Sequence, residues 1–502
     1  MVFNSIDFLV FFPIVLCVYF ILPAKVRYVW LLVSSYYFYM CWNPIYSILL
    51  LMVTISTYLG AIGIEKVREK QEGIGNNIQK YSKWIMIGTI TVNLGILTYF
   101  KYTNFLIDIV NKFLGIMSIG ELSGYDIMLP IGISFYMFTS IGYLVDVYKE
   151  KCEPEKNILK YALFISFFPM ILSGPIERSN NLLKQIQSKQ KTNDWDYERV
   201  TSGLITMLWG LFLKLVITDR IAVLADHVFN EYEMYGMIGL GIGAIAYGIQ
   251  IYCDFNSYST IALGAAKVLG FDLIQNFDTP YLAKGITEFW RRWHISLSSW
   301  FRDYIYIPLG GNRCGKSRQY LNILITFSVS GLWHGANWTF LFWGFLHGVY
   351  QIIEKELTPW IRKINEKLHT KTESFGYKFT KVMITFVLVD FAWIFFRAES
   401  MKQALHYIER MIKYRDWWSL FDQSIYQMGL DVTEIHILAL GLLLVLAVEL
   451  MQYFKRKTFA EFMAEQWMVF RWISLIAILV VCIVFGYYGP GFNSAQFIYF
   501  QF

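Results

Sequence analysis

Residues 435–454 read IHILALGLLLVLAVELMQYF. Within this stretch one carboxylate and one histidine stand among almost entirely apolar side chains. About 20 such residues are needed for a helix to cross the hydrocarbon core of a bilayer. The stretch therefore predicts a transmembrane helix, and it sets the pattern for the rest of the chain.

Similar apolar runs recur along all 502 residues. They cover residues 6–22, 30–40, 44–62, 84–99, 105–119, 128–145, 161–172, 205–228, 237–252, 259–269, 321–332, 338–353, 382–396 and 473–488. Several are too short to cross a bilayer alone, so we expect half-helices or re-entrant segments buried in protein. The number of full spans predicted in this way is roughly 10 to 12.

The composition excludes most other classes of protein. Hydrophobic residues make up 56% of the chain and charged residues 16%, whereas a typical soluble domain is about 25% charged. The six cysteines are scattered without a CxxC or Cys/His spacing, which predicts neither a metal site nor a disulfide framework. We therefore expect an all-α polytopic membrane protein.

Positive charge is concentrated in one polar segment, residues 284–320. Seven lysines and arginines stand there against two acidic residues, and 7 minus 2 gives +5 of the chain's total of +6. The positive-inside rule places this segment on the cytoplasmic side. The same charge would attract an anionic ligand such as a nucleotide-bearing acyl donor, although topology alone explains it.

Residues 310–317 read GGNRCGKS and match the phosphate-loop pattern GxxxxGK[ST]. A phosphate loop must follow a buried strand and open a helix in an α/β sheet. No such domain is expected here. We interpret these glycines as a tight turn.

His334, in the motif SGLWHGANW at 330–338, is the first candidate for chemistry. Apolar runs flank it, and an ionisable residue at membrane depth is a functional-site hypothesis by default. Histidine suits the removal of a proton from a hydroxyl nucleophile. From the residue alone, a core histidine satisfied by one hydrogen bond is an equally good interpretation.

Three further polar residues each have more than one interpretation. His294, in FWRRWHISLS at 289–298, would orient a polar donor group or belong to an interfacial belt. Asp254 would orient a histidine, line a polar tunnel or cap a helix. Lys214, inside an apolar run, would extend its ammonium to the interface or pair with a carboxylate.

Taken together, these motifs resemble the membrane-bound O-acyltransferase family, and most of all its bacterial members that O-acetylate alginate, cellulose or peptidoglycan. The resemblance covers most of the chain from Leu129 onward. It rests on FWRRWHISLSSWFRDYIYIPLGGNR at 289–313 and SGLWHGANWTFLFWG at 330–344, with LPIGISFYMFTSIGYLVDVYK at 129–149, SGPIERSNNLL at 173–183, YCDFNSYSTIALGAAKVLGF at 252–271 and FIYFQF at 497–502.

The resemblance implies an MBOAT-type helical bundle with a central funnel or tunnel and re-entrant short helices. The whole chain, 1–502, would form a single membrane-embedded acyltransferase domain. Its N-terminal helices would occupy 1–128 and its catalytic core 129–396. An amphipathic helix within 397–434 would lie in the membrane interface or pack on the protein. The C-terminal helices and the FIYFQF tail would occupy 435–502.

The resemblance also implies the site. His334 matches the catalytic histidine, His294 its polar partner, and Asp254 a family aspartate. Tyr499 is expected to relay the acyl group or to serve as an aromatic anchor. Substrate contacts are expected from Asp254 and from the residues around the histidines, namely Arg291, Arg292, Trp333 and Asn337. No metal and no bound cofactor are expected.

The implied function is transfer of an acetyl group from a cytoplasmic thioester such as acetyl-CoA to an extracytoplasmic polysaccharide or cell-wall glycan. The protein would be a multi-pass protein of the bacterial cytoplasmic membrane. Its partners would be membrane lipids, the glycan and an extracytoplasmic SGNH/esterase-like acetyltransferase, with no nucleic acid. The alternatives are D-alanyl or other acyl transfer, a non-enzymatic transporter or channel, and a subunit that recruits a soluble transferase.

Overall fold

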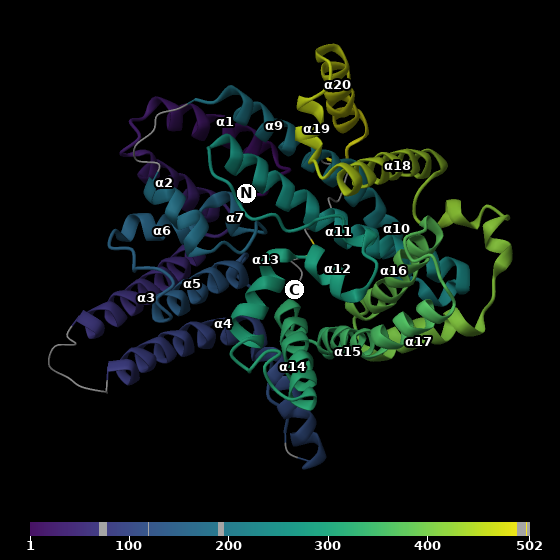
Figure 1. The fold of residues 1–502 in the computed structure, drawn as a ribbon, viewed down its shortest axis with the longest axis horizontal. Helices are drawn as coiled ribbons and strands as arrows, with labels where there is room; N and C mark the ends of the chain where they lie inside the picture. Colours follow the sequence, from purple (N-terminus) through teal and green to yellow (C-terminus); the bar gives the residue numbers. More distant parts are fainter. Residues whose placement is uncertain (70–77, 119, 189–194, 489–497, 499–502) are drawn as a thin grey trace. The chain divides into compact units, whose positions relative to one another are not determined.

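The elements of this protein are all helical in the part of the chain that the structure describes (Figure 1). The computed structural model describes residues 1–69, 78–118, 120–188, 195–488 and 498. No strand occurs within these ranges. The predicted all-α class is confirmed.

The first of two compact units contains Met1–Gly203 and Ala262–Ile274. Within it, α3 packs against α4 and α5, and α2 packs against α6. Its elements are α1 (Ile6–Ile21), α2 (Arg27–Met40), α3 (Pro44–Glu69), α4 (Ile78–Ile116), α5 (Ile133–Tyr148), α6 (Ile158–Ser166), α7 (Phe168–Ile171), the π-helical turn η3 (Ser179–Leu183) and α8 (Lys184–Ser188).

The second unit contains Leu204–Ile261 and Gln275–Phe502. Two long helices, α9 (Tyr197–Phe212) and α11 (Met237–Val268), belong in part to each unit. The other elements are η5 (Leu213–Thr218), α10 (Asp219–Asn230), η6 (Tyr232–Met234), η7 (Pro280–Leu282), α12 (Ile286–Arg292), α13 (Ile295–Phe301), η8 (Arg302–Tyr306), α14 (Lys316–His334), α15 (Trp338–Lys367), α16 (Phe375–Arg397), α17 (Met401–Lys413), η9 (Trp417–Leu420), η10 (Ser424–Gln427), α18 (Val432–Lys455), α19 (Phe459–Ala464) and α20 (Met468–Phe485).

Seven stretches of the described residues are helical, long and apolar enough to cross a membrane. They are Pro44–Glu69, Gln79–Ile116, Tyr197–Asn230, Met237–Val268, Phe375–Arg397, Val432–Lys455 and Met468–Phe485. The sequence predicts roughly ten to twelve, and part of the difference arises because neighbouring apolar runs join. Runs 84–99 and 105–119 both lie in α4, and runs 237–252 and 259–269 both lie in α11. The chain is a multi-pass membrane protein.

The GGNRCGKS segment forms a turn, as predicted. Gly310 and Gly311 have φ of 112° and 53°, the left-handed region that glycine enters without steric cost. The turn follows the π-helical η8 and leads into α14. The strand that a phosphate loop requires does not precede it.

Residues 401–413 form the expected amphipathic helix α17. The Ser400 hydroxyl caps it by accepting a hydrogen bond from the Gln403 N–H at 3.1 Å. Tyr407 is buried on the protein side and donates its hydroxyl to the Leu240 carbonyl at 2.7 Å. Leu405 and Ile412 are exposed on the remaining surface. The helix therefore packs on the protein through one side, and its placement in the membrane interface stays a prediction.

Candidate active site

His334 is the last residue of α14, in a close pair formed by α14 and α15. Two glycines permit this approach. A Cβ added at Gly331 would lie 2.2 Å from the Phe340 carbonyl oxygen, and one at Gly344 would lie 2.2 Å from that of Phe327. The small residues of SGLWHGANWTFLFWG thus let two backbones touch, and the turn between the helices places the His334 side chain in the interior, 4% exposed.

His294 lies between the short helices α12 and α13 with φ 43°, in the left-handed region. This conformation costs a non-glycine residue about 1–2 kcal/mol. Two backbone hydrogen bonds to a neighbouring segment hold the turn, Asp278 N–H to the Arg292 carbonyl at 3.0 Å and Ile295 N–H to the Asn276 carbonyl at 2.9 Å. His294 is 1% exposed.

Burial lowers the pKa of His294 well below its usual range, because a low-dielectric interior disfavours the imidazolium. This residue lies outside the seven candidate spans. At neutral pH its ring is therefore uncharged, with one nitrogen as donor and the other as acceptor. Such a ring can orient or polarise a carbonyl group.

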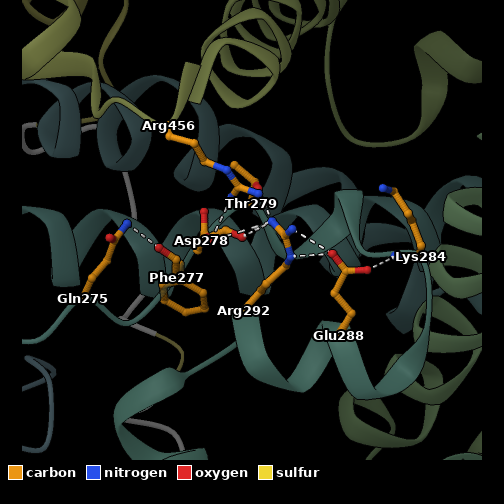
Figure 2. A network of polar contacts seen from close by, with 8 residues as sticks. All are labelled: Gln275, Phe277, Asp278, Thr279, Lys284, Glu288, Arg292 and Arg456. Atoms are coloured by element: carbon orange, nitrogen blue, oxygen red, sulfur yellow. Dashed lines mark hydrogen bonds and ion pairs between the residues drawn. The ribbon is translucent and has the colours of Figure 1, made fainter. Parts of the chain in front are cut away.

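Arg292 joins the two segments that form this turn (Figure 2). Its Nε and Nη2 donate to Glu288 Oε1 at 3.0 and 2.7 Å. Its Nη1 donates to the Asp278 carbonyl at 3.1 Å and to the Thr279 hydroxyl at 2.9 Å. Asp278 also pairs with Arg456 at 3.6 Å. Arg292, two residues before His294, thus connects α12 to the segment that contains Asp278 and Thr279.

The aromatic ring of Trp333 connects the two histidines. Its centroid lies 5.9 Å from that of His294 and 4.8 Å from that of His334. Phe255 contacts His294 at 4.6 Å. Trp343 and Phe396 each contact His334 with ring centroids 5.2 Å apart. The structure therefore brings together the two histidines predicted from separate motifs, inside a wall of aromatic rings.

Asp254 lies in the middle of α11, so its interpretation as a helix cap is wrong. Its Oδ1 accepts a hydrogen bond from Lys214 Nζ at 2.8 Å, and its Oδ2 accepts one from the Ile498 N–H at 2.7 Å. The Lys214 ammonium is also 2.8 Å from Asp219 Oδ1. Of the two interpretations of Lys214, pairing with a carboxylate is the one confirmed.

The remaining predicted residues have different surroundings. Arg291 is exposed. Asn337 caps α15 by accepting from the Thr339 N–H at 3.2 Å, and its amide donates to the Glu399 carbonyl at 3.0 Å. Tyr499 lies outside the described residues. A role in substrate binding for Arg291, Arg292, Trp333 and Asn337 stays a prediction.

Sequence reasoning missed several residues that the structure places at or near the site. Phe255 and Trp343 lie within the motifs at 252–271 and 330–344, and Phe396 ends the apolar run 382–396, but nothing in these patterns singles out the three aromatic rings. Asp219 could have been found, because it follows Lys214 by five positions in the same apolar stretch. No cluster of three or more histidines, cysteines or acidic residues with metal-binding geometry occurs in the part of the chain that the structure covers.

The fold and the site define a class: a multi-pass helical membrane protein with two histidines buried among aromatic rings. Residues 44–388 match the model of MBOAT, the membrane-bound O-acyltransferase family. This match covers more than half of the chain, and the chain belongs to that family. It is therefore an O-acyltransferase, which replaces the interpretations as a transporter, a channel or a recruiting subunit.

Similar proteins are found among bacterial enzymes. The chain is 38% identical over 419 residues to a probable alginate O-acetylase of Pseudomonas syringae pv. tomato, with 83% of this chain and 76% of the relative covered. It is 32% identical to the peptidoglycan O-acetyltransferase of Helicobacter pylori, with 82% and 80% covered. It is 26% identical to the teichoic acid D-alanyltransferase of Streptococcus thermophilus, with 51% and 67% covered.

Proposed function

We propose that this protein transfers an acetyl group from a cytoplasmic thioester, such as acetyl-CoA, for O-acetylation of an extracytoplasmic polysaccharide or cell-wall glycan in the bacterial cytoplasmic membrane. The observation that carries the proposal is the pair of buried histidines joined by Trp333. The names of the relatives that match more than four-fifths of the chain support the acetyl group and the glycan.

His334 acts as the general base in this proposal. It takes the proton from the acceptor hydroxyl, whose oxygen attacks the thioester carbonyl carbon. Neutral His294 donates its N–H to the carbonyl oxygen as negative charge develops there. The C–S bond then breaks, and the leaving thiolate takes the proton that His334 holds. The aromatic wall excludes water, which would otherwise hydrolyse the donor.

Two further parts of the chain serve the donor and the acceptor in this proposal. The net +5 of residues 284–320 attracts the phosphates of the donor. Tyr499, in FIYFQF, would accept the acetyl group and pass it to an extracytoplasmic SGNH/esterase-like partner. This relay rests on the resemblance of the terminal motif, and Tyr499→Phe tests it by removing the phenolic hydroxyl.

His334→Ala tests the function itself. Transfer of radiolabelled acetyl from acetyl-CoA to glycan is expected to fall at least about 100-fold, the usual contribution of a general base. The matched control is His406→Ala, because His406 is exposed on α17. Both variants are checked for membrane insertion and thermal stability in detergent. Full transfer by a folded His334→Ala variant contradicts the proposal.

A second acyl group has support from the D-alanyltransferase relative. The same membranes are therefore offered a D-alanyl thioester donor beside acetyl-CoA. Acetyl transfer is expected to be faster, since the acetylating relatives match at higher identity and over more of the chain. Preference for D-alanine reassigns the donor and leaves the histidine chemistry unchanged.

A further inference from the structure

A lysine ammonium is completely buried in the second unit. Lys214 lies in the π-helical η5 and is 0% exposed. Its Nζ is 2.8 Å from Asp219 Oδ1 and 2.8 Å from Asp254 Oδ1, and each aspartate is 2% exposed. Burying an ion is costly unless it is paired and hydrogen-bonded. The short contacts to both carboxylates offset this cost for Lys214.

The two carboxylates of this cluster differ in what they contact. Asp219 stands at the start of α10, five residues after Lys214, and its ion pair is with that lysine. Asp254 comes from α11, 40 residues away from Lys214. Its second oxygen accepts the backbone N–H of Ile498, 244 residues farther along the chain. Asp254 thus bridges the buried cation and the C-terminal segment.

The hydrogen bond between Asp254 and the Ile498 N–H is charge-assisted. Its acceptor is a carboxylate facing an ammonium, and charge-assisted bonds are about twice as strong as neutral ones. The distance from Ile498 N to Asp254 Oδ2 is 2.7 Å, and Ile498 is 4% exposed. Both partners are therefore shielded from water, which would compete for the bond.

This anchor is also close to the histidine pair. Phe255 follows Asp254 directly in α11, and its ring lies 4.6 Å from that of His294. Ile498 directly precedes Tyr499 in the sequence. The residue with the bonded N–H is therefore adjacent in sequence to the hydroxyl-bearing residue of the terminal motif, and the Asp254 carboxylate is adjacent in sequence to a residue that contacts His294.

We propose that Lys214 and Asp254 form a positioning device that holds Ile498, through its N–H, at the part of α11 whose Phe255 contacts His294. Lys214 is a positioning residue, because it acts by holding the Asp254 carboxylate. Asp219 is the second carboxylate that holds the same ammonium, at 2.8 Å. The proposal rests on the proposed function only for the consequence to catalysis; the anchor itself is independent of it.

Hydrogen–deuterium exchange tests the anchor without any acyl donor. In the wild-type protein, the Ile498 amide is expected to be protected. In Lys214→Met/Asp219→Asn, which removes the ammonium without leaving two facing carboxylates, the amide is expected to exchange at least about tenfold faster. The matched control, Asp219→Asn, leaves the Lys214–Asp254 pair intact and is expected to keep the protection. Equal exchange in the double variant and the wild type overturns the proposal.

The consequence for catalysis is tested with Ile498→Pro, which removes the N–H and leaves Lys214 and Asp254 in place. Acetyl transfer to glycan is expected to fall at least about tenfold with an unchanged unfolding temperature, since Asp254 no longer holds Ile498. Ile498→Val keeps the N–H and is expected to keep its protection. Wild-type transfer by the proline variant overturns the positioning role. Failure of the proposed function gives a different result: no acetyl transfer by the wild type, with its Ile498 amide still protected.

Discussion

Buried polar groups of the two units show two kinds of hydrogen bond. In the first unit, three buried hydroxyls donate within their own helix: Ser35, Thr54 and Ser166 each donate to the carbonyl four residues earlier, at 2.7, 2.7 and 2.8 Å. In the second unit, Lys214 and Arg292 take partners from other segments. A bond inside one helix forms with that helix, whereas a bond between segments forms only when the tertiary structure is complete.

This difference indicates where the chemistry lies. A hydroxyl bonded to its own helix adds little beyond packing. Imidazole groups are costly to bury when charged, and the buried histidines of the described residues, His294, His334 and His347, all belong to the second unit, which fits a site that uses them.

Arg292→Lys is expected to have the largest effect of the three. Lysine keeps the charge but cannot reproduce a planar fork with partners on two segments. We expect a loss of about 2 kcal/mol in the free energy of unfolding and a fall in acetyl transfer of at least about tenfold, because the His294 turn loosens. Denaturation in detergent and the glycan assay measure these.

Arg302→Lys serves as the control for that variant. Arg302 belongs to the same basic segment, but its side chain is 63% exposed and pairs with its neighbour Asp303. Exposed pairs contribute about 0–1 kcal/mol. If the two variants lose equal stability and activity, the hydrogen bonds of Arg292 beside the His294 turn have no special role.

Glu177→Gln tests a buried carboxyl group of the first unit that bonds between segments. Glu177 is buried between α7 and η3, and it accepts from the Ile274 N–H at 2.7 Å and from Asn181 Nδ2 at 2.8 Å. These partners are uncharged, and burial raises the pKa of this carboxyl to about 7.

The sign of the pH effect follows from that shift. Between pH 5 and 7 the folded protein keeps a proton that the unfolded chain has lost, so this group's contribution to stability falls as the pH rises. We expect the unfolding temperature of Glu177→Gln, measured in detergent, to depend less on pH in this window than that of the wild type. Parallel curves for the two proteins would contradict this assignment.

Ser166→Ala is expected to have the smallest effect. Its hydroxyl is fully buried and bonds to the Ala162 carbonyl within α6. The substitution removes the hydroxyl, and the Ala162 carbonyl can still accept a backbone hydrogen bond within the helix. We therefore expect the free energy of unfolding to change by no more than about 0.5 kcal/mol and acetyl transfer to stay unaltered. A loss of acetyl transfer in Ser166→Ala would contradict the view that hydroxyls bonded within their own helix have no role in the chemistry.

Much of the fold and part of the site were predictable. Apolar runs predicted helices, the glycines of GGNRCGKS predicted a turn, and the motifs singled out His294 and His334. The joining of neighbouring apolar runs into the single helices α4 and α11 was not predictable, because the polar residues between two runs do not reveal whether the helix continues through them. The partners of Arg292 were also missed, since nothing in its motif points to Thr279.

The class of this protein follows from its amino-acid sequence, because helix-forming apolar runs, turn glycines and motif residues are local properties of the chain. The motifs also indicate which histidines to examine. The packing of the folded chain brings both histidines into contact with Trp333 and joins Lys214 to Ile498 through Asp254. These contacts connect residues up to 244 positions apart. They depend on which buried charges and hydrogen-bonding groups meet when the helices pack, and no local pattern records that pairing.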